Sequence, residues 1–167
     1  MTKRKGFSLL EVIVYTAIIG VVGTLMTGIL VSLLKIQNLQ VATTDVHQQI
    51  NFVILNIQRF VRASSAINMV NNDEDPVLTL TMADSTKNPT LIYRTGTRIY
   101  LKEGTSMEVP LTSNDVTVED LQFIKISSAA GFDSIQFTVS MSYATENPQR
   151  EFSKTITSTV AHFNPES

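Results

Sequence analysis

The chain has 167 residues, enough for one modest domain on the usual scale of about 100–200 residues per domain, and its formal net charge is −2. It contains no cysteine, which excludes a disulfide, a thiol nucleophile and a thiolate metal site. Removal of residues 1–6 would take away three basic residues and no acidic one, so the remainder would be mildly acidic. Such a charge gives no reason to expect direct binding of nucleic acid.

The N-terminal segment has the pattern of a membrane span. Lys3, Arg4 and Lys5 come directly before an apolar run, Phe7 to Leu34, in which Glu11 is the only charged residue. About 20 apolar residues in a helix cross a bilayer, so we expect a transmembrane helix whose basic end stays in the cytoplasm. An ordinary signal peptide or plain anchor is the alternative, but the run has no small-residue cleavage motif at its end. Glu11 would cost roughly 2.5–3.5 kcal/mol in the bilayer unless it is paired, so we expect it to have a partner.

Residues 3–12, Lys-Arg-Lys-Gly-Phe-Ser-Leu-Leu-Glu-Val, resemble the prepilin peptidase signature of type IV pilins and of the related pseudopilins of type II secretion. The resemblance implies that a basic leader is cut off between Gly6 and Phe7 and that the new amino terminus at Phe7 is methylated. It also implies that Glu11, as the fifth mature residue, meets the positive N-terminus of a neighbouring subunit and sets the axial register. The implied partners are other pilin or pseudopilin subunits, the prepilin peptidase, an inner-membrane assembly platform and, before assembly, the lipid bilayer.

Gly20, Gly23 and Gly28 lie inside the apolar run. Each weakens a helix by roughly 1 kcal/mol relative to alanine, and small residues also allow helices to pack closely in membranes. Many major pilins that resemble this chain have proline where Gly28 stands, and part of their helix loosens in the filament. Flexibility at Gly20 and Gly28 and close helix packing therefore both stay open, and the missing proline favours a minor subunit or pseudopilin.

After Lys35 the helical period continues, so residues 35–70 are predicted to be an amphipathic continuation of one helix that ends near Ser65. Its apolar residues recur at steps of mostly three or four: Ile36, Leu39, Val46, Ile50, Val53, Ile54, Ile57, Phe60, Val61 and Ile67. The apolar stripe needs a surface to pack on, and the C-terminal region is the candidate. His47 lies on this helix and is expected to be solvated or hydrogen-bonded rather than a metal ligand.

Residues 71–167 are predicted to form a β-sheet domain. Residues 71–76, Asn-Asn-Asp-Glu-Asp-Pro, read as a solvated loop, with calcium binding by its three acids as the alternative. Alternating apolar residues then predict strands, a hairpin connection over 94–98 and loops at 129–131 and 146–148. The strands are expected near 77–82, 91–93, 99–101, 116–126, 135–143 and 152–160. The predicted fold class is α+β, a long helix packed on an antiparallel sheet of five to seven strands, which is also the fold that the resemblance implies.

No catalytic motif is present, so we expect no enzyme activity, no cofactor and no metal. With the resemblance, this favours a structural subunit, rather a minor one, of a filament of the type IV pilus, type II secretion or DNA-uptake kind. The alternatives are a major repeat subunit and a stand-alone membrane-anchored surface binding protein. The expected location is a single pass of the inner, cytoplasmic membrane with the C-terminal domain outside the cytoplasm, followed by an extracytoplasmic filament.

Overall fold

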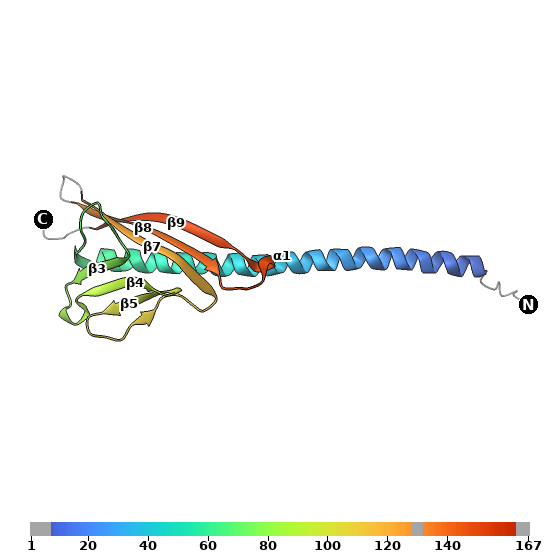
Figure 1. The fold of residues 1–167 in the computed structure, drawn as a ribbon, viewed down its shortest axis with the longest axis horizontal. Helices are drawn as coiled ribbons and strands as arrows, with labels where there is room; N and C mark the ends of the chain where they lie inside the picture. Colours follow the sequence, from blue (N-terminus) through green and yellow to red (C-terminus); the bar gives the residue numbers. More distant parts are fainter. Residues whose placement is uncertain (1–7, 128–131, 163–167) are drawn as a thin grey trace, which may run out of the picture. The chain divides into compact units, whose positions relative to one another are not determined.

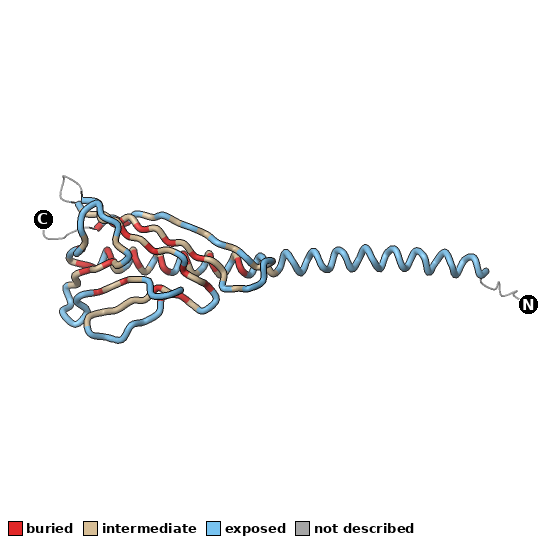
Figure 2. Tube along the Cα trace, in the orientation of Figure 1, coloured by how far each residue is buried: buried red, intermediate tan, exposed pale blue. Residues whose placement is uncertain are grey.

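A computed structural model of the chain describes residues 8–127 and 132–162. The chain divides into two compact units, Met1–Asn38 and Leu39–Ser167, and each is considered by itself. One helix, α1 (Leu9–Ala63), runs through the boundary. In the first unit every described side chain from Ser8 to Leu34 is exposed, as the uniformly pale blue stretch of helix in Figure 2 shows.

The second unit contains two antiparallel sheets, apart from one isolated parallel bridge between Asn71 and Lys125. Sheet A is five-stranded, in the order β1 (Ser64–Ile67), β3 (Val77–Met82), β4 (Thr90–Thr95), β5 (Arg98–Glu103) and β6 (Val109–Pro110). Sheet B is four-stranded, in the order β2 (Glu74–Asp75), β7 (Val116–Ser127), β8 (Asp133–Tyr143) and β9 (Ser153–His162). Two short 3-10 helices, η1 (Ser85–Lys87) and η2 (Pro148–Arg150), lie between strands.

The core of the second unit lies between α1 and the inner faces of both sheets (Figures 1 and 2). The helix contributes one stripe of fully buried residues at steps of three and four: Ala42, Val46, Ile50, Val53, Ile57 and Val61. The sheets contribute alternate strand residues such as Leu78, Ile92 and Phe123. Full burial of each such aliphatic or aromatic side chain contributes about 1.5–3 kcal/mol, so this stripe holds the domain on the helix.

The predicted stripe is confirmed over Val46–Val61 but not at its two ends. Ile36 and Leu39 are exposed, and Ile67 lies in β1 instead of the helix, where its Cα pairs with that of Leu80. The helix ends at Ala63, and the Ser64 hydroxyl donates to the carbonyl of Val61 over 2.8 Å. This end is close to the one predicted near Ser65, although no glycine or proline marks it, and the pairing of β1 with β3 follows directly.

The predicted α+β class is confirmed, with one difference in the sheet. The strands form two sheets instead of the single sheet expected. The segment read as a loop, residues 71–76, contains β2, which pairs with β7 at Phe123 and Ile124. The hairpin at 94–98 turns through Gly96, whose positive φ of 61° suits glycine. The loop expected at 129–131 lies outside the described residues.

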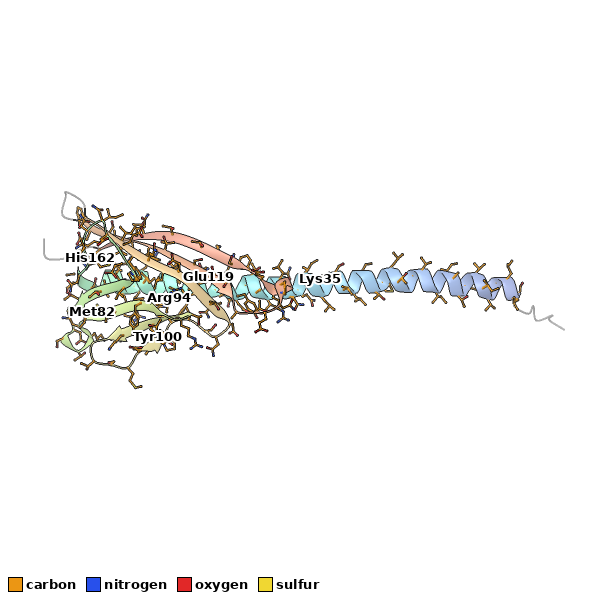
Figure 3. All side chains as sticks on the ribbon, viewed as in Figure 1. Lys35, Met82, Arg94, Tyr100, Glu119 and His162 are labelled. Atoms are coloured by element: carbon orange, nitrogen blue, oxygen red, sulfur yellow. The ribbon has the colours of Figure 1, made fainter. Side chains whose placement is uncertain are left out.

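The two sheets are joined where β7 carries a bulge. The pairing of β7 with β8 shifts register between Val118 and Asp120, which leaves carbonyls there without a regular ladder partner. Arg94 of β4 fills this role, because its Nη1 donates to the carbonyl of Val118 over 3.0 Å and to that of Glu119 (Figure 3). The amide of Val118 also donates to the carbonyl of Thr97 over 2.9 Å.

A second polar cluster holds the end of β1. Lys125 Nζ lies 3.0 Å from Asp133 Oδ2 and donates to the carbonyl of Ile67 over 3.2 Å. The Ser127 hydroxyl donates to Asp133 Oδ1 over 2.6 Å. That hydrogen bond holds the pKa of the Asp133 carboxyl below its usual range, and the Lys125 ammonium adds to the effect while burial opposes it.

The edge strand β9 is hydrogen-bonded near one end to α1 and near the other end to the first residue of β1, directly after α1. Lys154 Nζ lies 3.3 Å from His47 Nε2, and the His47 ring packs against the ring of Phe152. At the other end, the Nε2–H of the buried His162 donates to the carbonyl of Ser64 over 2.8 Å. The prediction that His47 is hydrogen-bonded is therefore confirmed.

We expect replacement of Arg94 by methionine to destabilise the domain by about 1–3 kcal/mol, because it leaves the bulge carbonyls of Val118 and Glu119 without their donor. Urea unfolding of the full chain in detergent, followed by circular dichroism, measures this. Arg98→Met is the matched control, since no described hydrogen bond depends on Arg98, and its effect should stay within about 0.5 kcal/mol. Equal effects of the two variants would contradict the role given to Arg94.

We expect Asp133→Asn to be more destabilising at pH 7 than in acid. The folded-state pKa of Asp133 is depressed, so its contribution is complete above the unfolded-state value near 3.8 and is lost as the pH falls through the folded-state value. The difference in unfolding free energy between the parent chain and Asp133→Asn should therefore shrink as the pH falls below about 3.8. A difference that stays constant down to pH 2 would contradict this linkage.

Candidate assembly and processing site

The residues that the sequence assigns to processing lie at the chain's start. Lys3, Arg4, Lys5, Gly6 and Phe7 are outside the described residues, so their roles stay predictions. The structure begins at Ser8, whose carbonyl accepts hydrogen bonds from the amides of Glu11 over 3.0 Å and Val12 over 3.3 Å. The first turn of α1 thus starts directly after the predicted cleavage point.

Glu11 lies in this first turn with an exposed side chain. A carboxylate there is favoured by the positive end of the helix dipole, typically by 0.3–1 kcal/mol when it is exposed to water. Within residues 8–127 and 132–162 the ion pairs are Lys87–Glu103 and Lys125–Asp133, and neither involves Glu11. The described part of the chain therefore supplies no cation for Glu11, and compensation in a membrane or filament must come from another source.

The helix that follows is long and apolar enough to cross a membrane, and none of its most apolar window is buried within the chain. The side chains of Leu9, Leu10 and Ile19 are each at least 70% exposed. Removal of apolar surface from water is favourable by about 25 cal/mol of free energy for each Å², so an uncovered helix of this kind is stabilised by lipid or by other helices around it.

The hydroxyl groups of this helix are satisfied by the helix itself. Thr16, Thr24, Thr27 and Ser32 each donate to a carbonyl three or four residues earlier, over 2.8–3.0 Å. A hydroxyl without a partner is costly in hydrocarbon, whereas one bonded to the preceding turn is tolerated. These hydrogen bonds make the helix more compatible with lipid. The sequence pattern that identifies such residues is serine or threonine inside an apolar helical run.

Gly20, Gly23 and Gly28 lie on the unbroken helix, and apart from the adjacent residues and the neighbouring helix backbone no described atom of the chain lies within 4 Å of where a methyl group would stand on any of them. The glycines therefore leave small, open notches on the helix surface. Such notches are compatible with close approach of another helix. The flexibility assigned to Gly20 and Gly28 stays a prediction.

In the second unit α1 presents a further apolar strip on the side away from the core. Val41, Phe52 and Leu55 are each at least half exposed. Residues 41, 52 and 55 fall on one helical face, roughly opposite the buried stripe, at 100° of rotation per residue. These three residues lie outside the predicted stripe, which follows the residues that face the sheets.

The remaining acidic and histidine side chains do not gather into a metal-binding group in the part of the chain that the structure describes. No group of three or more His, Asp or Glu side chains there is placed to hold a metal ion. In the acidic segment, Asp73 Oδ1 accepts from the amide of Glu74 and Asp75 Oδ1 from that of Val77, over 3.0 and 2.8 Å. These carboxylates thus support the local turn.

Comparison with known proteins bears on the N-terminus. Residues 1–27 match the family model described as the prokaryotic N-terminal methylation motif. No curated protein and no solved structure shows a significant match to the chain. The chain thus carries a prepilin-type methylation motif, and its apolar helix and antiparallel sheets form a pilin-like α+β fold. Both findings are consistent with the type IV pilin and pseudopilin family.

Proposed function

We propose that the chain is a minor structural subunit of a type IV pilus or pseudopilus-like filament, present in fewer copies than the main subunit. In this proposal it is processed by prepilin peptidase and assembled through its N-terminal helix. The observation that carries the proposal is the methylation motif over residues 1–27, followed by an apolar helix that the chain itself leaves uncovered. Gly28 in the place of the proline of many major pilins supports the minor role.

Insertion and processing come first. Lys3, Arg4 and Lys5 keep the N-terminus in the cytoplasm, and the domain from Leu39 onward is then outside it. Hydrolysis of the Gly6–Phe7 bond removes the leader and creates a new amino group on Phe7, which accepts one methyl group. The product is a membrane-anchored subunit whose cationic N-terminus lies four residues before Glu11.

Assembly then exchanges lipid for other helices. The Glu11 carboxylate pairs with the N-terminal ammonium of a neighbouring subunit, a pairing that lipid does not offer and that fixes the axial register. The buried charge is tolerable in the filament because it is compensated. The open notches at the glycines and the strip of Val41, Phe52 and Leu55 support helix contacts on the membrane side and beyond it.

The first test is the intact mass of the protein isolated from its native cells, with and without the prepilin peptidase. We expect the mature chain to begin at Phe7 and to carry one added methyl group only when the peptidase is present. Retention of residues 1–6 in both strains would contradict the proposal and favour a stand-alone anchored surface protein. The number of copies per filament, determined on purified filaments, then distinguishes a minor from a major subunit.

A second test concerns Glu11. We expect Glu11→Gln to leave membrane insertion and leader cleavage unchanged but to lower incorporation into filaments by about tenfold or more, because the N-terminal ammonium of the neighbour loses its counter-charge. Glu11→Asp, which keeps the charge on a shorter side chain, is the matched control. Its incorporation into filaments should lie between that of the parent chain and that of Glu11→Gln. Immunoblots of membrane and sheared-filament fractions measure both effects, and normal incorporation of Glu11→Gln would exclude this pairing.

A further inference from the structure

The outer face of sheet A carries aromatic and basic side chains that the fold does not use. Leu78, Ile92 and Ile99 of β3, β4 and β5 point into the core and are fully buried. Because side chains alternate along strands, the residues between them lie on the opposite face. On that face the half-buried residues include Val77, Leu91, Tyr93, Arg98, Tyr100 and Lys102.

The centre of this face is a pair of tyrosines. Tyr93 and Tyr100 are direct cross-strand partners, with ring centroids 6.4 Å apart and planes inclined by 28°. Interaction of the Tyr93 hydroxyl with the Glu108 carboxylate, with smaller contributions from burial and nearby charge, raises the pKa of Tyr93 to about 12. Stacking restricts both rings before any partner arrives, which lowers the entropy lost on binding. Figure 3 shows Tyr100 on this side of the sheet.

Two cations flank Tyr100 on β5. Arg98 and Lys102 are two residues before and after it, so all three project from the same face. In the described part of the chain neither cation forms an ion pair, since the two that occur join Lys87 with Glu103 and Lys125 with Asp133. Tyrosine and arginine are the residues most enriched among the anchors of protein interfaces, so this face has the composition of a docking surface.

The same domain carries a surface of complementary charge. A cavity of about 300 Å³ lies where β7, the end of β8 and the start of β9 meet, and its lining includes Glu119, Glu146, Glu151, Tyr143 and Ser153. Residues 111–162 as a whole carry six acidic and three basic side chains, whereas residues 77–110 carry three of each once Arg94, which is bonded to the bulge carbonyls, is set aside. The excess of acidic side chains in the domain thus lies in the part of the chain that forms most of sheet B.

We infer that the outer face of sheet A docks on the acidic cavity of a second copy of this chain. The Arg98 guanidinium and Lys102 ammonium meet the carboxylates of Glu119, Glu146 and Glu151 there, and Tyr100 packs against the rim. A guanidinium can bind a carboxylate through two parallel hydrogen bonds, which gives the contact direction as well as energy. The occupant is a second copy because the chain itself supplies the complementary surface.

This contact joins unlike surfaces, so each copy keeps one free face and one free cavity after docking. A contact of that kind can extend from copy to copy, as subunits of a helical filament require. The inference therefore rests on the proposed function, and it adds that copies of this subunit, although fewer than those of the main subunit, adjoin one another where they occur in the filament.

Cysteine cross-linking can test the contact, because the chain has no cysteine of its own. Two full-length copies with different tags are co-expressed in cells that process the leader, one with Thr95→Cys beside Arg98 and one with Ser153→Cys at the cavity. We expect a short bifunctional maleimide to join the two cysteines, which gives a product that carries both tags. The matched control replaces Ser153→Cys by Thr159→Cys, an exposed position about 20 Å further along β9, and should give no product.

Charge reversal then tests the pairing itself. Arg98→Glu with Lys102→Glu in the first copy should lower the cross-link yield by about tenfold or more, and so should Glu146→Lys with Glu151→Lys in the second copy. With both reversals present, the yield should return to within about twofold of the parent, because the two surfaces again carry charges of opposite sign. Failure of this rescue would overturn the inference, as would equal products at Ser153 and Thr159 or cross-links only to a different subunit.

Leader cleavage and membrane content of every variant are measured in the same samples. If the copies do not cross-link although residues 1–6 are removed and Phe7 is methylated, only the docking contact is wrong. If the leader is retained, the proposed function is wrong as well.

Discussion

The structure depends on a single apolar stripe on α1. Val46, Ile50, Val53, Ile57 and Val61 are fully buried, and the inner faces of both sheets meet over them. Each sheet alone would leave one apolar face in water, and the stripe is the surface that lets both avoid this. The helix residues before Leu39 take no part in this core, so the two units of the chain are stabilised by different surroundings.

The charges follow the same division. In the apolar segment the hydroxyls of Thr16, Thr24 and Thr27 are bonded within the helix. The Glu11 carboxylate in the same segment has no ion-pair partner in the described part of the chain. In the domain, by contrast, Arg94 and Lys125 both have internal partners, at the bulge of β7 and at the end of β1. Charges with internal partners hold the fold, and charges without them are available for contacts with other molecules.

Much of this organisation follows from the sequence, because hydropathy and period are local signals. The span, the stripe from Val46 to Val61 and the strands β3, β4, β5, β7, β8 and β9 are recognised from composition and alternation, and α1 ends at Ala63, close to the end expected near Ser65. The strands β1, β2 and β6 and the division into two sheets are not, since pairing between distant segments decides them. For the same reason, the link between Arg94 and the bulge has no sequence signature. At the candidate site, the processing residues follow from the motif. The strip of Val41, Phe52 and Leu55 does not follow from the sequence, because only the structure shows which face of α1 the sheets cover.

Two hydrogen bonds from β9, one to His47 of α1 and one to Ser64 directly after the helix, bear on where the helix can change length. From His47 to Ser64 a helix rises by about 26 Å, and from Lys154 to His162 a strand covers about the same distance. The length of the edge strand therefore matches the length of this part of the helix. Stretching of the helix between these two points would break one of the hydrogen bonds and separate the buried stripe from the sheets, so extension of α1 under load costs less before His47 than after it. The domain would then keep its structure while the helix before it lengthens.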